Sequence, residues 1–138
     1  MYLKRVEIKD SGIEGKGVFA MENVSTGDLV CRFDSTHDLT LSSQEYDMLS
    51  AEAKADIRKV GYVSFSSGKW VYPPEDDPAR FTNHSETENN LTAKIDPTIS
   101  DEPFFVANRD INKGEELTVN YVEFDDSIKQ GRPDWMSR

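Results

Sequence analysis

The sequence predicts a mostly β domain with one helical insert. Short runs of β-branched and aromatic residues recur along the chain with turn residues between them, whereas a single segment follows the helical period. The length of 138 residues suits one compact domain, which buries roughly two-thirds of its unfolded surface without a disulfide or metal. We therefore expect residues 1–138 to form a single domain.

The expected strands are brief and lie on both sides of the helical insert. Turn sequences such as Thr26-Gly27-Asp28 and Asn112-Lys113-Gly114 separate them. The proline-rich acidic segment 73–78 is expected to be a stiff connector and not helix or central strand. The runs expected as strands are Val6 with Ile8, Gly17–Ala20, Leu29–Phe33, Gly61–Phe65, Trp70–Tyr72, Leu91–Ile95, Phe104–Ala107 and Leu117–Tyr121.

The helical insert is expected over residues 42–60. Ser42 and Glu45 have the spacing of a capping box, and Leu41 with Tyr46 has that of a hydrophobic staple. Gly61 can end the helix. Apolar residues recur with the helical period at Tyr46, Leu49, Ala53, Ile57 and Val60.

Two stretches of the chain resemble each other. Each looks like a strand, a polar turn that ends in glycine and an acid, and a second strand. Two similar turns in an all-β body explain this likeness more simply than a duplicated functional unit. The residues at equal spacing are Ala20, Val24, Gly27, Asp28 and Val30 in one stretch and Ala107, Ile111, Gly114, Glu115 and Leu117 in the other.

The chain is acidic, with a formal net charge of −10 and a pI near 4.6. This charge argues against nucleic acid and against an anionic membrane surface as partners. Residues 1–69 carry 11 acidic and 9 basic side chains, whereas residues 70–138 carry 15 and 7. Solubility explains any single acidic run, and the alternative is a site in the second half that attracts a cationic partner.

Several site classes do not fit the residues that are present. One cysteine and two histidines allow neither an intrachain disulfide nor a zinc site of four cysteine or histidine ligands, and we expect no metal. Met1–Asp10 alternates charged and apolar residues, unlike a signal peptide, and no apolar run is long enough to span a membrane. An intracellular, cytoplasmic location is therefore the default expectation.

Three motifs occur in a fixed order: Gly15–Ala20 (GKGVFA), Arg80–Ser85 (RFTNHS) and Gly114–Tyr121 (GEELTVNY). Together they resemble the SET domain, the family of S-adenosylmethionine-dependent protein lysine methyltransferases, over roughly residues 3–124. The resemblance implies several small, mostly antiparallel sheets with a helical insert and a knot-like crossing near the C-terminus. It also implies methyl transfer from S-adenosyl-L-methionine to a lysine of a basic protein or peptide. A histone-like substrate would make a nuclear location the expectation.

The resemblance further implies which residues hold the cofactor. The glycine backbone of the first motif would pack against it, with Lys16 near its carboxylate end, and the Asn-His pair would contact it through backbone and amide groups. The residues expected to bind the cofactor are Gly15, Lys16, Gly17, Arg80, Phe81, Asn83 and His84.

The resemblance implies that Tyr121, which closes the third motif, is the catalytic residue, with its hydroxyl beside the reacting methyl group. Transfer to a neutral amine needs the nitrogen, the methyl carbon and the sulfur on one line, so the site must solve a positioning problem. A dry aromatic channel also lowers the pKa of the target lysine. Tyr62 is the expected second tyrosine, although strand packing explains it equally well. Val119, Phe124 and Trp135 are expected to line the channel.

Some residues depart from the family pattern. The family usually continues with cysteine, any residue, proline and asparagine, whereas this chain has Glu86-Thr87-Glu88-Asn89 and retains only the asparagine. Asn120 replaces the usual aspartate. Val119 stands where the family often has an aromatic residue, so we expect room for more than one methyl group. The cysteine-rich flanks that bind zinc are absent, which implies a compact, zinc-free form. Because the end of the chain retains Phe124 and Trp135, we expect the tail 125–138 to fold back over the site.

Two interpretations of the acidic second half follow from the resemblance. The first is an enzyme whose acidic residues attract a basic peptide; the alternative is a non-catalytic SET-like module that binds cofactor or peptide, which Glu86 and Glu88 favour. The acidic residues that flank the motifs are Glu75, Asp76, Asp77, Glu86, Glu88, Glu123, Asp125 and Asp126.

Overall fold

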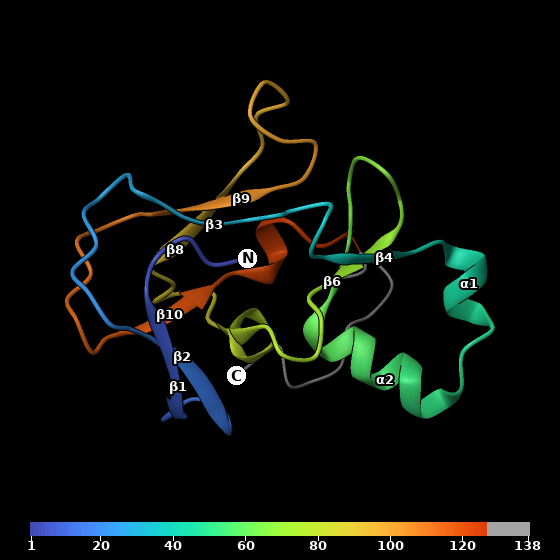
Figure 1. Cartoon of the computed structure of the whole chain (residues 1–138), viewed down its shortest axis with the longest axis horizontal. Helices are drawn as coiled ribbons and strands as arrows, with labels where there is room; N and C mark the ends of the chain where they lie inside the picture. Colours follow the sequence, from blue (N-terminus) through green and yellow to red (C-terminus); the bar gives the residue numbers. More distant parts are fainter. Residues whose placement is uncertain (127–138) are drawn as a thin grey trace.

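Three small β-sheets make up most of the regular structure of the computed structural model, which describes residues 1–126 (Figure 1). One sheet has the strand order β1-β2-β10-β7, the second β3-β9-β8 and the third β4-β6-β5. In chain order the elements are β1 (Val6–Asp10), β2 (Lys16–Ala20), β3 (Leu29–Arg32), β4 (Leu39–Leu41), α1 (Ser43–Asp47), α2 (Ala51–Val60), β5 (Tyr62–Val63), β6 (Trp70–Tyr72), the 3₁₀ helix η1 (Pro78–Phe81), β7 (Asn83–His84), β8 (Leu91–Lys94), β9 (Phe104–Ala107), β10 (Glu116–Val119) and the 3₁₀ helix η2 (Tyr121–Glu123).

This architecture confirms the prediction of a mostly β domain with a helical insert. The strand expected over Leu117–Tyr121 ends earlier than expected, at Val119. The Asn120 side chain accepts a hydrogen bond of 3.0 Å from the Val122 N–H, which starts η2 at Tyr121. Tyr121 therefore stands at the beginning of a helical turn.

The insert consists of two helices, and the prediction of one continuous helix over residues 42–60 was wrong. The capping box is present: Glu45 N–H donates to Ser42 Oγ, and Ser42 N–H donates to the Glu45 carboxylate. A second cap interrupts the helix because Ser50 Oγ accepts the Ala53 N–H at 3.1 Å. Local capping thus divides a segment whose apolar period is continuous.

Gly61 ends α2 by donating its N–H to the Ile57 carbonyl at 2.8 Å. Its φ of −108° lies outside the left-handed region, so backbone conformation does not demand glycine here. A Cβ atom at this position would lie 2.8 Å from the Val71 carbonyl oxygen. Glycine is therefore needed for the close approach of the α2 end to β6.

The two similar stretches of the sequence lie against each other. Val24 and Ile111 exchange reciprocal N–H···O bonds, both of 2.8 Å, and both turns contain a glycine with positive φ. The likeness in sequence therefore corresponds to two equivalent turns that pair with each other. The bonds that repeat in both directions are Gly27 N–H to Ala107 O and Gly114 N–H to Ala20 O at 2.8 Å, and Thr26 N–H to Asp110 Oδ1 and Lys113 N–H to Asn23 Oδ1 at 2.9 Å.

Of the two hydrophobic clusters in the described part of the chain, the larger joins the first two sheets. A smaller cluster of Ile57, Val63 and Trp70 packs α2 against the third sheet, where Tyr46 stacks on Trp70 with ring centroids 4.8 Å apart. Within residues 1–126, no helix is long and apolar enough to cross a membrane. The larger cluster contains Val18, Ala20, Val24, Val30, Leu91, Ala107, Ile111, Leu117, Val119, Tyr121 and Phe124.

Candidate functional site

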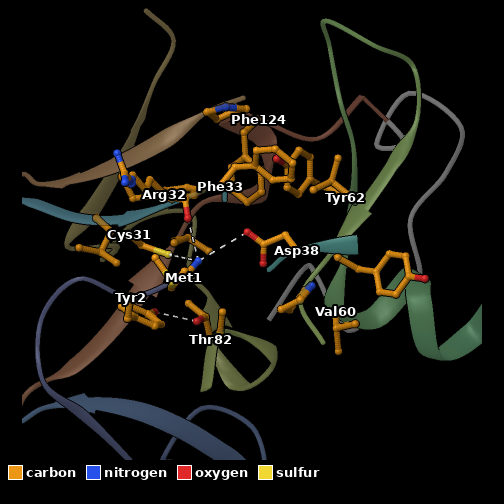
Figure 2. A pocket seen from close by; sticks show the side chains of 18 of the residues that line it. Met1, Tyr2, Cys31, Arg32, Phe33, Asp38, Val60, Tyr62, Thr82 and Phe124 are labelled. Atoms are coloured by element: carbon orange, nitrogen blue, oxygen red, sulfur yellow. Dashed lines mark hydrogen bonds and ion pairs between the residues drawn. The ribbon is translucent and has the colours of Figure 1, made fainter. Parts of the chain in front are cut away.

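An apolar cavity of about 90 Å³ is lined by residues from all three sheets (Figure 2). Val119 reaches it from β10, Phe105 from β9 and Tyr62 from β5, while Tyr121 and Phe124 come from the segment after β10. Four residues expected from the sequence at the reacting end, Tyr62, Val119, Tyr121 and Phe124, are therefore brought together. Trp135, the remaining expected channel residue, lies outside the described residues.

Phe124 is the centre of the aromatic side chains at this cavity. Its ring meets Tyr62 edge-on, with centroids 5.2 Å apart, and lies 4.9 Å from the rings of Tyr121 and Phe105. Such contacts hold the two tyrosines in a fixed relation through a shared neighbour. Phe105 was not among the expected site residues, because its strand pattern alone does not distinguish a cavity wall from core.

His84 and Tyr121 are positioned by the pairing of β7 with β10. These strands run parallel, with His84 opposite Val119, and Ser85 N–H continues the pairing by donating to the Val119 carbonyl at 2.9 Å. His84 is buried, its Nδ1 accepts the Tyr121 N–H at 3.1 Å, and the two rings meet edge-on. The middle and last motifs of the sequence therefore meet in one hydrogen-bonded unit.

Asn90 is a site-forming residue that sequence reasoning missed. Its buried side chain replaces a strand neighbour for β10, donating to the Glu116 carbonyl at 2.8 Å and accepting the Thr118 N–H at 2.9 Å. Asn89, the asparagine that matches the family pattern, donates instead to the Leu91 carbonyl. Two adjacent asparagines after the middle motif were the only signal in the sequence.

The Asn83 amide lies in a group of hydrogen-bond acceptors beside the first motif. Its Nδ2 lies 3.2 Å from the Glu14 carbonyl, 3.0 Å from the Lys16 carbonyl, 2.8 Å from Glu116 Oε2 and 3.1 Å from Ser11 Oγ. An NH₂ group has two hydrogens, so four acceptors exceed what it can satisfy. The surplus suits a further donor group, such as an ammonium.

Glycine is needed at the two glycine positions of the first motif for different structural reasons. Gly15 has a φ of +43° with open space where a side chain would begin. A Cβ at Gly17 would instead lie 2.2 Å from Glu116 Oε2, which Ser11 and Asn83 hold in place. The first motif therefore leaves backbone exposed at Gly15 and packs a carboxylate onto Gly17.

The other residues expected at the cofactor have partners elsewhere. Lys16 Nζ pairs with Asp10, its cross-strand neighbour on β1, at 2.6 Å. Arg80 donates to Asp56 on α2 at 2.8 Å and to the Pro73 carbonyl at 3.1 Å. Phe81 is partly exposed at the end of η1. The structure thus brings Asn83, Gly15 and Gly17 together, whereas Arg80 holds η1 to the helical insert.

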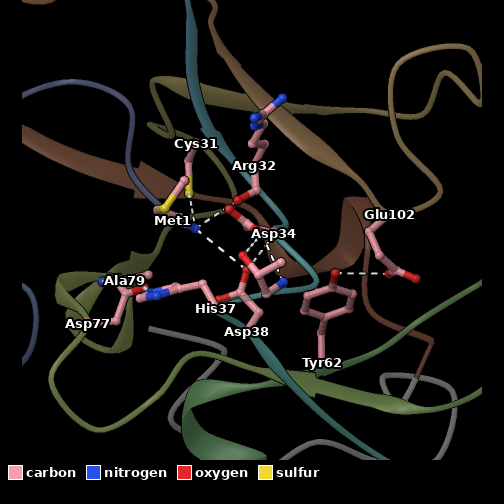
Figure 3. Close-up of polar contacts among 11 residues, drawn as sticks. Met1, Cys31, Arg32, Asp34, His37, Asp38, Tyr62, Asp77, Ala79 and Glu102 are labelled. Carbon is pink, nitrogen blue, oxygen red and sulfur yellow. Dashed lines mark hydrogen bonds and ion pairs between the residues drawn. The ribbon is translucent and has the colours of Figure 1, made fainter.

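A polar cluster lies next to the apolar cavity (Figure 3). His37 Nε2 lies 2.5 Å from Oδ2 of the buried Asp77, and this hydrogen bond raises the pKa of His37. Burial raises the pKa of the neighbouring Asp38 carboxyl. Asp77 also accepts the Ala79 N–H at 2.8 Å, so one carboxylate connects the β3–β4 loop to the start of η1.

Two acidic residues expected to attract a cationic partner are buried. Asp77 pairs with His37, and Asp125 accepts the Val63 N–H at 3.0 Å, so both serve the interior of the protein. Glu86 is exposed, with its carboxylate 3.6 Å from His84 Nε2. Glu86 therefore lies beside the His84–Tyr121 unit and faces solvent.

Comparison with known proteins gives one consistent family. The SET domain family matches residues 15–122. A histone-lysine N-methyltransferase, set1 of Dictyostelium discoideum, is 30% identical over 131 residues, which cover 86% of this chain and 8% of that protein. The chain thus spans a small part of that relative.

Solved structures support the same fold. The Polycomb Repressive Complex 2 of Chaetomium thermophilum bound to GSK126 matches with a TM-score of 0.62 and 28% identity, over 92% of this chain and 17% of that one. A candidate histone methyltransferase of Plasmodium falciparum matches with a TM-score of 0.57 and 20% identity, over 86% of this chain and 93% of that one. The second likeness concerns the fold alone.

Proposed function

Because this chain belongs to the SET domain family, we propose that it is a protein lysine methyltransferase that uses S-adenosyl-L-methionine. The observation that carries the proposal is the apolar cavity in which Tyr121 and Tyr62 share the Phe124 ring, directly beside the bond between His84 and Tyr121. A narrow aromatic cavity suits the aliphatic stem of a lysine and excludes water from its amine.

The residues around Asn83 fit the amino acid end of the cofactor. The carbonyls of Glu14 and Lys16, which lie beside the Asn83 amide, are acceptors that would hold the cofactor ammonium. Gly15 leaves the neighbouring backbone open to a ligand. When bound, S-adenosyl-L-methionine supplies a methyl group activated by its sulfonium.

The protein's own part in the reaction is to orient and desolvate. The Tyr121 hydroxyl would align the methyl by weak C–H···O contacts, and β7 holds this residue in register through His84. Exclusion of water from the apolar cavity disfavours a charged amine, which lowers the pKa of the target lysine and leaves its lone pair available. Catalysis would then rest mainly on positioning.

Val119 lines the cavity at the position where the family often has an aromatic residue. Its smaller side chain leaves space beside Tyr121, so we expect the target lysine to accept more than one methyl group. The buried aromatic neighbours still limit the size of the final product.

The proposed substrate is a basic peptide segment, of which a histone tail is one source. The histone-lysine methyltransferase relative supports this class, and the exposed carboxylates of Glu86 and Glu123 add negative charge near the site. Buried Asp77 and Asp125 contribute less to attraction than the sequence suggested.

A calorimetric titration with S-adenosyl-L-methionine, followed by transfer of a radiolabelled methyl group to lysine-rich proteins, tests this function. Binding and transfer are expected together. Binding without transfer to any lysine-rich substrate would favour the alternative of a non-catalytic module, for which the exposed Glu86 beside His84 is the specific observation. The absence of both binding and transfer would contradict the proposal.

A further inference from the structure

Glu102 is a buried carboxylate immediately behind the cavity. Only 6% of its surface is exposed, and it directly precedes Pro103, which lines the cavity two residues before Phe105. One carboxylate oxygen accepts the Tyr62 hydroxyl at 3.0 Å (Figure 3). The other oxygen accepts the Ser64 hydroxyl at 2.9 Å. Glu102 therefore contacts the cavity wall through Tyr62.

The partners of this carboxylate are hydroxyl groups. Ser66 Oγ is a third donor at 3.3 Å, and none of the ion pairs within residues 1–126 includes Glu102. Burying a carboxylate without a cation is costly, and neutral side chains would fill the same space at less expense in stability. A role in packing alone does not account for a carboxylate at this position.

The carboxylate determines what Tyr62 can do. A phenol has one O–H, and Tyr62 donates it to Glu102, so its oxygen can only accept from any other partner. Burial, together with the negative charge of Glu102, raises the pKa of Tyr62 far above its ordinary value. Tyr62 therefore stays a neutral acceptor at the cavity.

We propose that Glu102 is a positioning residue that directs the Tyr62 hydroxyl proton away from the substrate, so that Tyr62 accepts an N–H of the target lysine amine. This inference rests on the proposed lysine methyltransferase function. An amine held by its N–H presents its lone pair in one direction, which is what an in-line displacement requires. The contact needs no covalent participation of either residue.

The proposal distinguishes the successive methyl transfers. A neutral lysine amine has two N–H groups, a monomethyl-lysine has one, and a dimethyl-lysine has none. The Tyr62 oxygen can therefore accept a hydrogen bond from lysine and from monomethyl-lysine but not from dimethyl-lysine. Glu102 should matter for the first and second transfers only.

Four variants test this role: Glu102→Gln, Tyr62→Phe, the double variant, and Asp101→Asn as the matched control on an exposed neighbour. Glutamine keeps the size of Glu102, but its NH₂ group can donate to the Tyr62 oxygen and reverse the hydroxyl. The kcat for the same basic peptide is measured with unmethylated, monomethylated and dimethylated lysine.

For Glu102→Gln we expect kcat to fall about tenfold with the unmethylated and monomethylated peptides, because one oriented hydrogen bond is lost. With the dimethylated peptide kcat should stay within about twofold of the wild type. The double variant should be no slower than Tyr62→Phe, and Asp101→Asn should match the wild type. Equal losses on all three peptides, or the same loss in the Tyr62→Phe background, would overturn the proposal. An inactive wild type would instead count against the proposed function itself.

A spectroscopic measurement on the wild type keeps the test independent of how Glu102→Gln folds. The ring carbon that bears the hydroxyl is observed by NMR in protein labelled with ¹³C-tyrosine, with Tyr62→Phe identifying the Tyr62 signal. Adding a lysine peptide should shift this signal, whereas a norleucine peptide, which lacks the amine, should not. An unshifted Tyr62 signal in the presence of saturating lysine peptide contradicts the proposal.

Discussion

The backbone N–H of Tyr121 donates a hydrogen bond of 3.1 Å to Nδ1 of His84 within the core. Because Nδ1 acts as the acceptor, the imidazole is neutral and carries its proton on Nε2. This bond connects the end of β10 to β7, so the residue next to the Asn83 amide also orients the turn that carries Tyr121. The cofactor side and the lysine side of the proposed site are thereby joined through one side chain.

Replacing His84 with alanine should destabilise the fold. The Tyr121 N–H would be left buried without its acceptor, at a cost of about 1–3 kcal/mol in the free energy of unfolding, with a further loss from the cavity. His84→Asn places an oxygen near the position of Nδ1 and should retain a clear part of that stability. Urea unfolding of both variants measures the difference, and equal losses would show that the hydrogen bond is not the cause.

Gly17→Ala should weaken binding of S-adenosyl-L-methionine. The added Cβ would displace the Glu116 carboxylate, which in turn holds the Asn83 amide. We expect the dissociation constant from calorimetry to rise about tenfold. Gly12→Ala is the matched control because a Cβ there meets no atom within 4 Å, and it should leave affinity unchanged. If Gly12→Ala raised the dissociation constant as much as Gly17→Ala, displacement of the Glu116 carboxylate would be excluded as the cause.

The stability that the His37–Asp77 pair contributes should depend on pH. The hydrogen bond to Asp77 raises the pKa of His37 above its ordinary value of 6.5. Because the pKa of His37 is higher in the folded state than in the unfolded state, the stability contributed by the pair is fully present below the unfolded-state pKa. It is then lost as pH rises through the folded pKa.

Asp77→Asn tests this dependence, since asparagine can still cap η1. The difference in Tm between wild type and Asp77→Asn should be larger near about pH 5.5 than near about pH 8.5. His37→Gln serves as the second comparison, and its difference in Tm from the wild type should likewise become smaller as pH rises. A difference that widens with rising pH would contradict the assigned direction.

Attraction of a basic substrate by the acidic surface should respond to salt. Screening shortens the range of exposed charges to about 8 Å at physiological ionic strength and to about 3 Å at 1 M. We expect the KM for a basic peptide to rise several-fold over that range while kcat changes little. A KM that does not change with ionic strength would remove charge from the account of substrate recognition.

The expected site residues lie close together in the structure mainly where they belong to short motifs. Asn83, His84 and Tyr121 belong to such motifs, and the pairing of β7 with β10 brings His84 and Tyr121 into contact, while the roles of all three stay predictions. Arg80 belongs to the same motif as Asn83, yet its guanidinium binds Asp56 on α2. A motif conveys order along the chain, whereas the direction of a long side chain depends on its neighbours in space.

Residues outside the motifs were harder to predict because their partners are distant in sequence. Glu102 is 40 residues from Tyr62, and the Asn90 side chain meets β10 26 and 28 residues away. The break between α1 and α2 was missed for a different reason, because the Ser50 cap competes with an apolar period that continues across it. The knot-like crossing near the C-terminus stays a prediction.

The most direct test of the central claim is methyl transfer by the wild type and by Tyr121→Phe, measured with radiolabelled S-adenosyl-L-methionine and a lysine-rich protein. The substitution removes one hydroxyl and keeps the ring that packs against His84 and Phe124, so the fold should be preserved. We predict transfer by the wild type and at least a tenfold lower kcat for Tyr121→Phe, with cofactor affinity within about threefold. Equal rates for the two proteins, or no transfer by a wild type that binds the cofactor, would contradict the account.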